Sequence, residues 1–325
     1  FRDATDELGM TDQIGKGLAV LAADFNQDQI PEIYVANDMT ANFLYTRNSN
    51  DPSVYDDVAV PSGCAQSGEG MNEASMGISC SDFDLDGLPD LYLTHYYNMQ
   101  NTLYKNHGEL QFEDVSRRMR TAQTGFPFLG FGTLTIDYDG NRYPDLFVTN
   151  GHVLGPAVQP DRMTPQWLYN HHGQHFEDIT RRLDGYFQKT WLGRGAASAD
   201  FDNDGDLDIA VTHLDDPAAL LRNSTKTGKR FIGFDLRTRE RIIPCGSRVT
   251  VTSRLGTHGP TVVQSQSLML GGSYLSSSDP RIVFPVDHQA DSVDVQIQWS
   301  SGKVEEFPAM SLDRYWHLAE GAQPW

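Results

Sequence analysis

Acidic side chains recur in four short stretches of this chain, at a spacing that suits a divalent cation. In each stretch, oxygen-bearing side chains stand at positions 1, 3, 5 and 9. Ca²⁺ takes roughly six to eight oxygen ligands in loops of this kind, including a backbone oxygen at position 7. The predicted metal ligands are Asp24, Asn26, Asp28, Ile30, Glu32, Asp82, Asp84, Asp86, Leu88, Asp90, Asp137, Asp139, Asn141, Tyr143, Asp145, Asp200, Asp202, Asp204, Asp206 and Asp208.

Such loops need a cation, because two carboxylates about 4 Å apart repel by roughly 4 kcal/mol at an effective dielectric near 20. An EF-hand shares the opening pattern but requires a bidentate Glu at position 12 and a helix on either side. Position 12 is instead Val35, Leu93, Val148 or Val211, each inside a β-type run. The sequence therefore predicts strand, calcium loop, strand, with about four Ca²⁺ per chain. Solvated acidic turns without metal are the alternative.

The loops belong to a longer repeat. A run of small and apolar residues precedes each loop, and a strand-like run such as Leu91–Thr94 follows it. A Leu-Tyr-x-Asn-like marker comes next, as at 103–106, and a Phe-Glu-Asp marker begins at Phe112 and again at Phe176. The chain opens on a similar marker at Phe1, so we expect the first repeat to be entered partway through.

This succession resembles the FG-GAP/VCBS repeat of integrin-like β-propellers, and most closely the proteins related to cartilage acidic protein. The resemblance covers about residues 1–223 and implies an all-β propeller with one calcium loop in each blade. It implies a seven-bladed ring of which four repeats are visible, the interpretation we favour over a four-bladed ring closed by the first and last segments. Gln29 and Arg142 replace the glycine at position 6, which predicts weaker or more strained sites in loops one and three.

The pattern changes after the polar linker 224–228. Apolar residues alternate with period two in Arg248–Thr252 and Ser292–Trp299, which predicts short strands and a small β-sandwich. Segments beginning at Cys245, Gly271 and Trp299 resemble the ASPIC/UnbV domain that follows the propeller in that family. We therefore divide the chain into propeller repeats at 1–223 and an ASPIC/UnbV-like domain at 224–325.

Composition narrows the possible partners. The 325-residue chain has a formal net charge of −19, which disfavours nucleic acid and anionic membrane surfaces. No apolar run is long enough to span a membrane, and no basic-then-apolar leader opens the sequence, so we expect a mature or trimmed chain. Abundant calcium loops favour a secreted, extracellular or periplasmic location. Cys64 and Cys80 could pair, leaving Cys245 as a buried thiol or one with a lost partner.

The function that fits best is an extracellular binding or adhesion module for a protein or glycan, in which calcium is structural and oligomers are possible. The long insertions 48–73 and 151–166 are the expected binding loops, because rigid scaffolds often carry function on variable loops. We expect the basic pairs at 117–118 and 181–182 to bridge to the acidic loop of the next blade, with docking of a partner as the alternative. A structural subunit of an extracellular assembly is a further possibility.

An enzyme or enzyme subunit is the rival class. His95 and His213 occupy the same repeat position, with His152 two residues past the equivalent Asn150. If they converged at the mouth of a propeller channel, they could bind a transition metal or cofactor. The simpler interpretation is that they are strand-end residues hydrogen-bonded to neighbouring blades. The sequence offers no Gly-x-Ser-x-Gly elbow or His-Glu-x-x-His pair.

Overall fold

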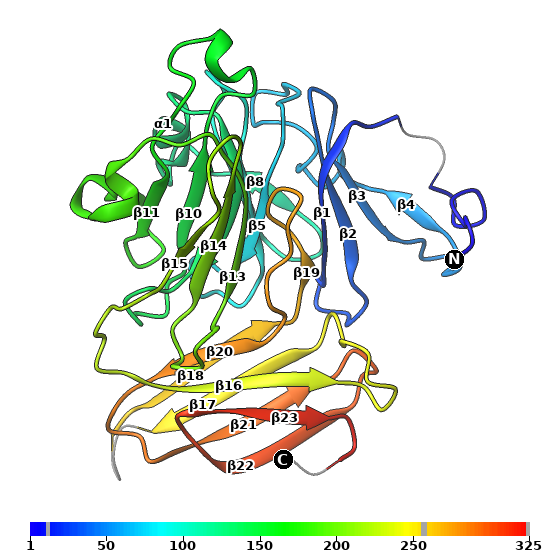
Figure 1. Cartoon of the computed structure of the whole chain (residues 1–325). Coiled ribbons are helices and arrows are strands. Elements are labelled where there is room, and N and C mark those ends of the chain that lie inside the picture. Colours follow the sequence, from blue (N-terminus) through cyan, green and yellow to red (C-terminus); the bar gives the residue numbers. More distant parts are fainter. Residues whose placement is uncertain (11–13, 255–258, 323–325) are drawn as a thin grey trace.

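The computed structural model describes residues 1–10, 14–254 and 259–322. In these residues the fold is all-β apart from one short α-helix, α1 (Thr121–Gly125), and three single-turn 3₁₀ helices. Four antiparallel sheets stand side by side in the N-terminal part, and two further sheets form the C-terminal part below them (Figure 1). No helix in the described residues is long and apolar enough to cross a membrane.

Each repeat forms one sheet, in which the acidic loop connects the first strand to the second. The strands of the four sheets, in chain order, are β1 (Gly17–Ala23), β2 (Glu32–Asn37), β3 (Phe43–Arg47) and β4 (Tyr55–Asp57); β5 (Ile78–Ser81), β6 (Asp90–Leu93), β7 (Thr102–Asn106) and β8 (Phe112–Asp114); β9 (Gly130–Ile136), β10 (Asp145–Asn150), β11 (Gln166–Asn170) and β12 (Phe176–Asp178); and β13 (Gly193–Ala199), β14 (Asp208–His213) and β15 (Ala219–Leu221). The predicted unit of strand, loop and strand is therefore confirmed in all four repeats.

Neighbouring sheets bury apolar side chains against each other. The aromatic residue at position 2 of each of the first two loops packs on the Phe of the Phe-Glu-Asp marker in the following repeat. Phe25 meets Phe112 edge-on at 5.5 Å between ring centroids, and Phe83 meets Phe176 at 5.6 Å. Each pair lies in a buried cluster drawn from two adjacent sheets. In the first two loops the aromatic residue therefore joins consecutive sheets of the propeller repeats.

The C-terminal part is the predicted β-sandwich. Its apolar alternation buries Val249, Val251, Val295, Ile297 and Trp299 between the two sheets. Its strands are β16 (Arg230–Arg237), β17 (Arg248–Arg254), β18 (Thr261–Ser267), β20 (Ile282–Val286), β21 (Ser292–Gln298), β22 (Val304–Ser311) and β23 (Arg314–Ala319). Strands β20, β16 and β23 form one sheet, and β18, β17, β21 and β22 the other.

One segment of the C-terminal part leaves its own domain. Between β18 and β20 the chain rises among the blades, where β19 (Leu270–Gly271) pairs with β1 (Figure 1). Further along, Ser273 pairs with Ile78 of β5, and the Asp279 N–H donates to the Ser198 carbonyl of β13 at 2.9 Å. Gly271 is required because a Cβ there would lie 2.3 Å from the Val20 carbonyl oxygen. This segment thus contacts strands of blades one, two and four.

One expectation changes with the structure. Cys64, Cys80 and Cys245 are all free thiols, so the suggested Cys64–Cys80 disulfide is wrong. The seven-bladed ring stays a prediction.

Candidate metal centres

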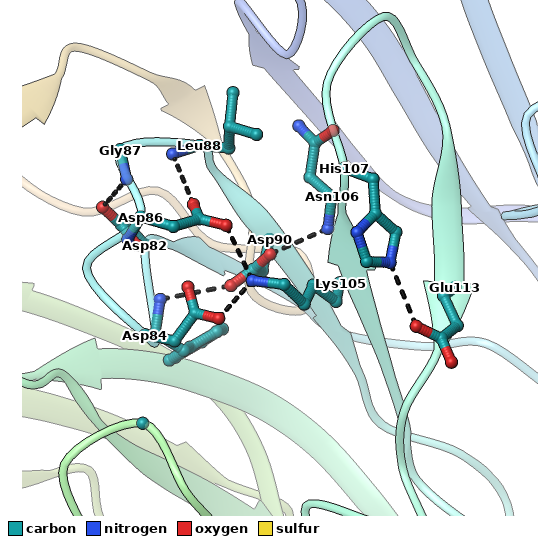
Figure 2. A network of polar contacts seen from close by, with 12 residues as sticks. Asp82, Asp84, Asp86, Gly87, Leu88, Asp90, Lys105, Asn106, His107 and Glu113 are labelled. Carbon is teal, nitrogen blue, oxygen red and sulfur yellow. Dashed lines mark hydrogen bonds and ion pairs between the residues drawn. The ribbon is translucent and has the colours of Figure 1, made fainter.

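The four acidic loops share one backbone conformation, shown for loop two in Figure 2. In every loop the carboxylate at position 1 accepts hydrogen bonds from the backbone N–H groups of positions 5 and 6. In loop two, Asp82 accepts from Asp86 at 3.1 Å and from Gly87 at 2.8 Å. The side chain at position 5 then accepts from the N–H of position 7, as Asp86 does from Leu88 at 2.9 Å. The same bonds recur in loops one, three and four.

Position 6 has a left-handed backbone in all four loops. Gly87 and Gly205 adopt φ values of 94° and 95°, which glycine tolerates without a steric cost. Gln29 and Arg142 adopt 71° and 80° at the same position, where an L-residue with a Cβ is strained by about 1–2 kcal/mol. The predicted strain of loops one and three is confirmed, while their predicted weaker ion binding remains a prediction.

In loops two, three and four, the carboxylate at position 9 is anchored by the backbone N–H of the marker's last Asn, a role that the sequence alone did not reveal. The backbone N–H of Asn106 donates to Asp90 at 2.8 Å. The Asn106 side-chain amide also donates to the Phe25 carbonyl, in the loop of the preceding blade, at 2.9 Å. In blade three, Asn170 repeats these contacts with Asp145 and Phe83. Loops one and two are therefore each bonded to the next blade as well as to their own.

Burial leaves the carboxylates of these loops poorly solvated. Asp145 is 0 % exposed, Glu32 1 % and Asp90 3 %. Burial, followed by repulsion from neighbouring loop carboxylates, raises the pKa of Asp90 and of Asp145 to about 8 in spite of their backbone hydrogen bonds. The same cause raises the pKa of Glu32 to about 7. Such groups favour either a proton or a bound cation.

The donor set fits a hard divalent cation. Oxygen atoms of Asp82, Asp84 and Asp86 lie within 4.8 Å of one another, as do those of Asp200, Asp202 and Asp208. Two buried carboxylate oxygens, Oδ1 of Asp84 and Oδ2 of Asp145, have no hydrogen-bond partner. An unpaired buried carboxylate oxygen is costly, and a coordinated metal ion would satisfy it.

All four loops face the C-terminal sandwich. The contacts, in loop order, are Gly246 against Gln29, Arg248 on the Gly87 carbonyl, Lys229 against Gly140 and Tyr315 on Asp200. In loop four the Tyr315 hydroxyl donates to Asp200 Oδ2 at 2.8 Å, and the Arg281 guanidinium donates to Asn203 Oδ1 at 2.7 Å. The candidate metal loops therefore form much of the surface on which the C-terminal domain packs.

The three candidate histidines form no common site, and the ring of each contacts a different residue. Nε2 of His95 lies 2.9 Å from the Thr102 hydroxyl, Nδ1 of His152 accepts from the Leu154 N–H at 3.2 Å, and Nε2 of His213 lies 2.8 Å from the Tyr186 hydroxyl. Among the described residues, the groups of His, Cys, Asp or Glu compact enough to share an ion are the two acidic triads. A metal or cofactor held by these histidines stays a prediction without an assembled site. His95 and His152 are bonded to neighbouring blades through their backbone carbonyls, which accept from the Gly130 N–H at 3.1 Å and from the Arg194 guanidinium at 3.2 Å, as the simpler interpretation expects.

The expected role of the basic pairs is wrong. Arg117 pairs with Glu69 of the 48–73 insertion, Arg118 with Glu113 and Arg182 with Glu177, each a residue outside the acidic loops. Within the repeats, Lys105 and Arg222 form ion pairs with carboxylates of the acidic loops. Both stand directly before the Asn of the Leu-Tyr-x-Asn-like marker, and this shared position was the sequence signal that could have predicted their contact with the loops.

Comparisons with known proteins agree with the repeat pattern. A family model described as FG-GAP-like repeat matches residues 82–148 and 137–211, and one described as ASPIC and UnbV matches residues 240–324. Cartilage acidic protein 1 of Homo sapiens is 23% identical over 312 residues, which cover 94% of this chain and 44% of that protein. The Mus musculus protein is also 23% identical, over 313 residues and 45% of its length. The chain thus spans less than half the length of these relatives.

A solved structure of an Agrocybe aegerita lectin that recognises non-reducing terminal N-acetylglucosamine superposes with a TM-score of 0.39 at 14% identity. The alignment covers 91% of this chain and 80% of the lectin. A likeness this weak carries no argument about function.

Proposed function

We propose that this chain, which carries FG-GAP-like repeats followed by an ASPIC and UnbV domain, is a calcium-stabilised extracellular binding module. The observation that carries the calcium part is the set of four loops of one backbone conformation whose clustered carboxylates are largely buried, with Oδ1 of Asp84 and Oδ2 of Asp145 lacking a hydrogen-bond partner. Ca²⁺ would supply a countercharge and coordinate the side chains at positions 1, 3, 5 and 9. Ca²⁺ is favoured over Mg²⁺ because the loops offer many oxygens in an irregular arrangement, whereas Mg²⁺ demands near-octahedral geometry.

An extracellular location follows from the affinity expected of such sites. Extracellular calcium modules bind in roughly the 10⁻⁴ to 10⁻³ M range, which matches fluids rich in calcium. At a hundredfold excess over its dissociation constant, each bound ion adds about 2.7 kcal/mol to the stability of the folded state. Calcium is therefore proposed as a folding ligand that keeps the blades ordered outside the cell.

The proposed ligand surface lies where the 48–73 insertion crosses blade two. A cavity of about 310 Å³ there is lined by Glu69, Glu73, Asp114, Arg117 and Phe126 among others. The insertion is fixed in place, since the Gly68 N–H donates to Asp114 at 2.7 Å and the Tyr104 hydroxyl donates to the Gln66 carbonyl at 2.8 Å. Carboxylates and a guanidinium beside an aromatic ring suit the hydroxyls of a glycan or the basic side chains of a protein.

The test has two parts. Elemental analysis of purified protein should find about four Ca²⁺ per chain, and a chelator should lower the melting temperature strongly. On a glycan array and a set of immobilised basic peptides, Arg117→Ala should remove binding that the wild type shows. The adjacent Arg118→Ala, which lies outside the cavity, serves as the matched control. Little bound calcium with no chelator effect would refute the calcium part, and equal binding by both variants would refute the assigned surface.

A further inference from the structure

A basic side chain from the third strand of a blade reaches the acidic loop of that blade. In blade two, Lys105 at the end of β7 places its ammonium between Asp84 and Asp86, 2.7 Å from Asp86 Oδ2 (Figure 2). In blade four, Arg222 directly after β15 forms ion pairs with Asp202 and Asp204. In both blades the base contacts carboxylates at positions 3 and 5 of the loop.

Strand register shows that these two residues are equivalent. Tyr104 pairs with Leu91 and Leu221 pairs with Ile209, and both Leu91 and Ile209 directly follow position 9 of their loops. Lys105 and Arg222 are the next residues along. By the same register, the equivalent residues in blades one and three are Thr46 and Tyr169.

Those two residues also reach their own loops, but without a charge. The Thr46 hydroxyl donates to Glu32 Oε1 at 3.2 Å, and the Tyr169 hydroxyl donates to Asp139 Oδ2 at 3.1 Å. The third-strand residue therefore contacts the ligand carboxylates in all four blades, and its charge alternates along the chain.

The charge at this position follows the charge of the loop. Loops one and three each have an amide, Asn26 or Asn141, among positions 1, 3, 5 and 9, and their third-strand residue is neutral. Loops two and four have aspartate at all of these positions, and their third-strand residue is a cation. Where the loop carries one more carboxylate at positions 1, 3, 5 and 9, the third strand supplies one positive charge.

We propose that Lys105 and Arg222 are internal cations that offset part of the negative charge of loops two and four when no metal is bound and compete with Ca²⁺ for the same carboxylates. This inference rests on the proposed function, because it concerns the sites that would hold Ca²⁺. A divalent ion at loop two needs the Asp84 and Asp86 oxygens that the ammonium contacts. The two cations also repel each other, so the flexible lysine stem has to move its charge toward water when the ion binds.

The competition has two opposite consequences. It weakens calcium binding at loops two and four relative to an uncharged third-strand residue. It also keeps the metal-free loops folded, because a positive charge remains among the clustered carboxylates. Loops one and three lack this device and depend more completely on the ion.

Methionine in place of Lys105 tests this, because it has a similar length without the charge. Calcium binding is followed by calorimetric titration of the full chain, and thermal melts are recorded in chelator. Lys105→Met should bind Ca²⁺ about tenfold more tightly at one site and melt at a lower temperature in chelator than the wild type. Lys303→Met is the matched control, since Lys303 pairs at 2.8 Å with Glu305 in the C-terminal domain. The reciprocal Thr46→Lys should weaken one site.

The outcomes separate this inference from the proposed function. If the wild type binds about four Ca²⁺ but Lys105→Met leaves the affinity unchanged or lowers it, the inference is overturned and the calcium assignment stands. Binding of Ca²⁺ by Lys105→Met at a site silent in the wild type would support the inference in its strongest form. If neither the wild type nor Lys105→Met binds Ca²⁺, both the proposed function and the inference are refuted.

Discussion

Replacing Tyr315 by Phe tests whether loop four and the C-terminal domain support each other. The change removes one hydroxyl, which donates to Asp200 Oδ2 at 2.8 Å across the domain boundary. Asp200 is 1 % exposed and its other contacts, from the N–H groups of Asp204 and Gly205, remain. Burial raises the pKa of the Tyr315 hydroxyl, so it stays a protonated donor.

The expected loss follows from the kind of bond. A hydrogen bond to a charged group contributes about 1.5–3 kcal/mol, and the Tyr315 ring keeps its packing on Arg281 and Phe231 when the hydroxyl is removed. We therefore expect Tyr315→Phe to lower the free energy of unfolding by about 1.5–3 kcal/mol. Since Asp200 is also a proposed ligand at position 1, calcium affinity at one site should fall as well, because outer contacts orient metal ligands.

The assay is urea unfolding in saturating calcium, followed by a calcium titration. Tyr55→Phe is the matched control, because the Tyr55 hydroxyl has no hydrogen-bond partner within the described residues. A Tyr315→Phe variant as stable as Tyr55→Phe, with unchanged calcium affinity, would show that the interdomain bond does not support the loop.

Three further predictions concern the loops. In chelator, the melting temperature should rise as the pH falls from about 8 toward 5, because the raised pKa values of Asp90 and Asp145 mean that the folded state binds more protons than the unfolded state there; a metal-free melt that falls over this range would contradict the burial argument. Phe83→Ala should cost about 3–5 kcal/mol of stability in urea unfolding, whereas Phe201→Ala, at the equivalent but 47 % exposed position, should cost far less; equal losses would refute the role of the aromatic residue between blades. Gln29→Gly should stabilise the protein by about 1 kcal/mol through relief of its positive φ, while Gln29→Ala should not, and an equal gain from both would refute the strain.

The sequence predicted the repeat because every blade reuses one local pattern. Positions 1, 5, 6 and 7 of a loop bond to each other within a few residues, so their spacing alone implies the turn. Strand pairing across the loop is equally local. For the same reason the strain at Gln29 followed directly from a missing glycine.

Contacts between repeats could not be predicted in this way. The Asn106 amide bonds to Phe25, 81 residues away, and which marker meets which loop depends on how adjacent sheets pack. The expected bridging of Arg117 to the next loop was wrong because the 48–73 insertion brings Glu69 closer. The pairing of β19 with β1 depends on where the C-terminal domain lies relative to the repeats, and no periodicity in the sequence gives that position.

The loops are positioned so that the proposed ion binding would act on more than one blade. Asn106 ties the carboxylate of Asp90 to the backbone of the preceding loop, while Phe83 in the loop of Asp90 packs on the following blade. An ion that fixes loop two therefore fixes contacts with blades one and three, and the carbonyl of Gly87 holds Arg248 of the C-terminal domain at 3.1 Å. Because no single sheet buries both of its faces alone, stability in this chain resides at these junctions. A cation bound at each junction would order neighbouring blades and the C-terminal domain together.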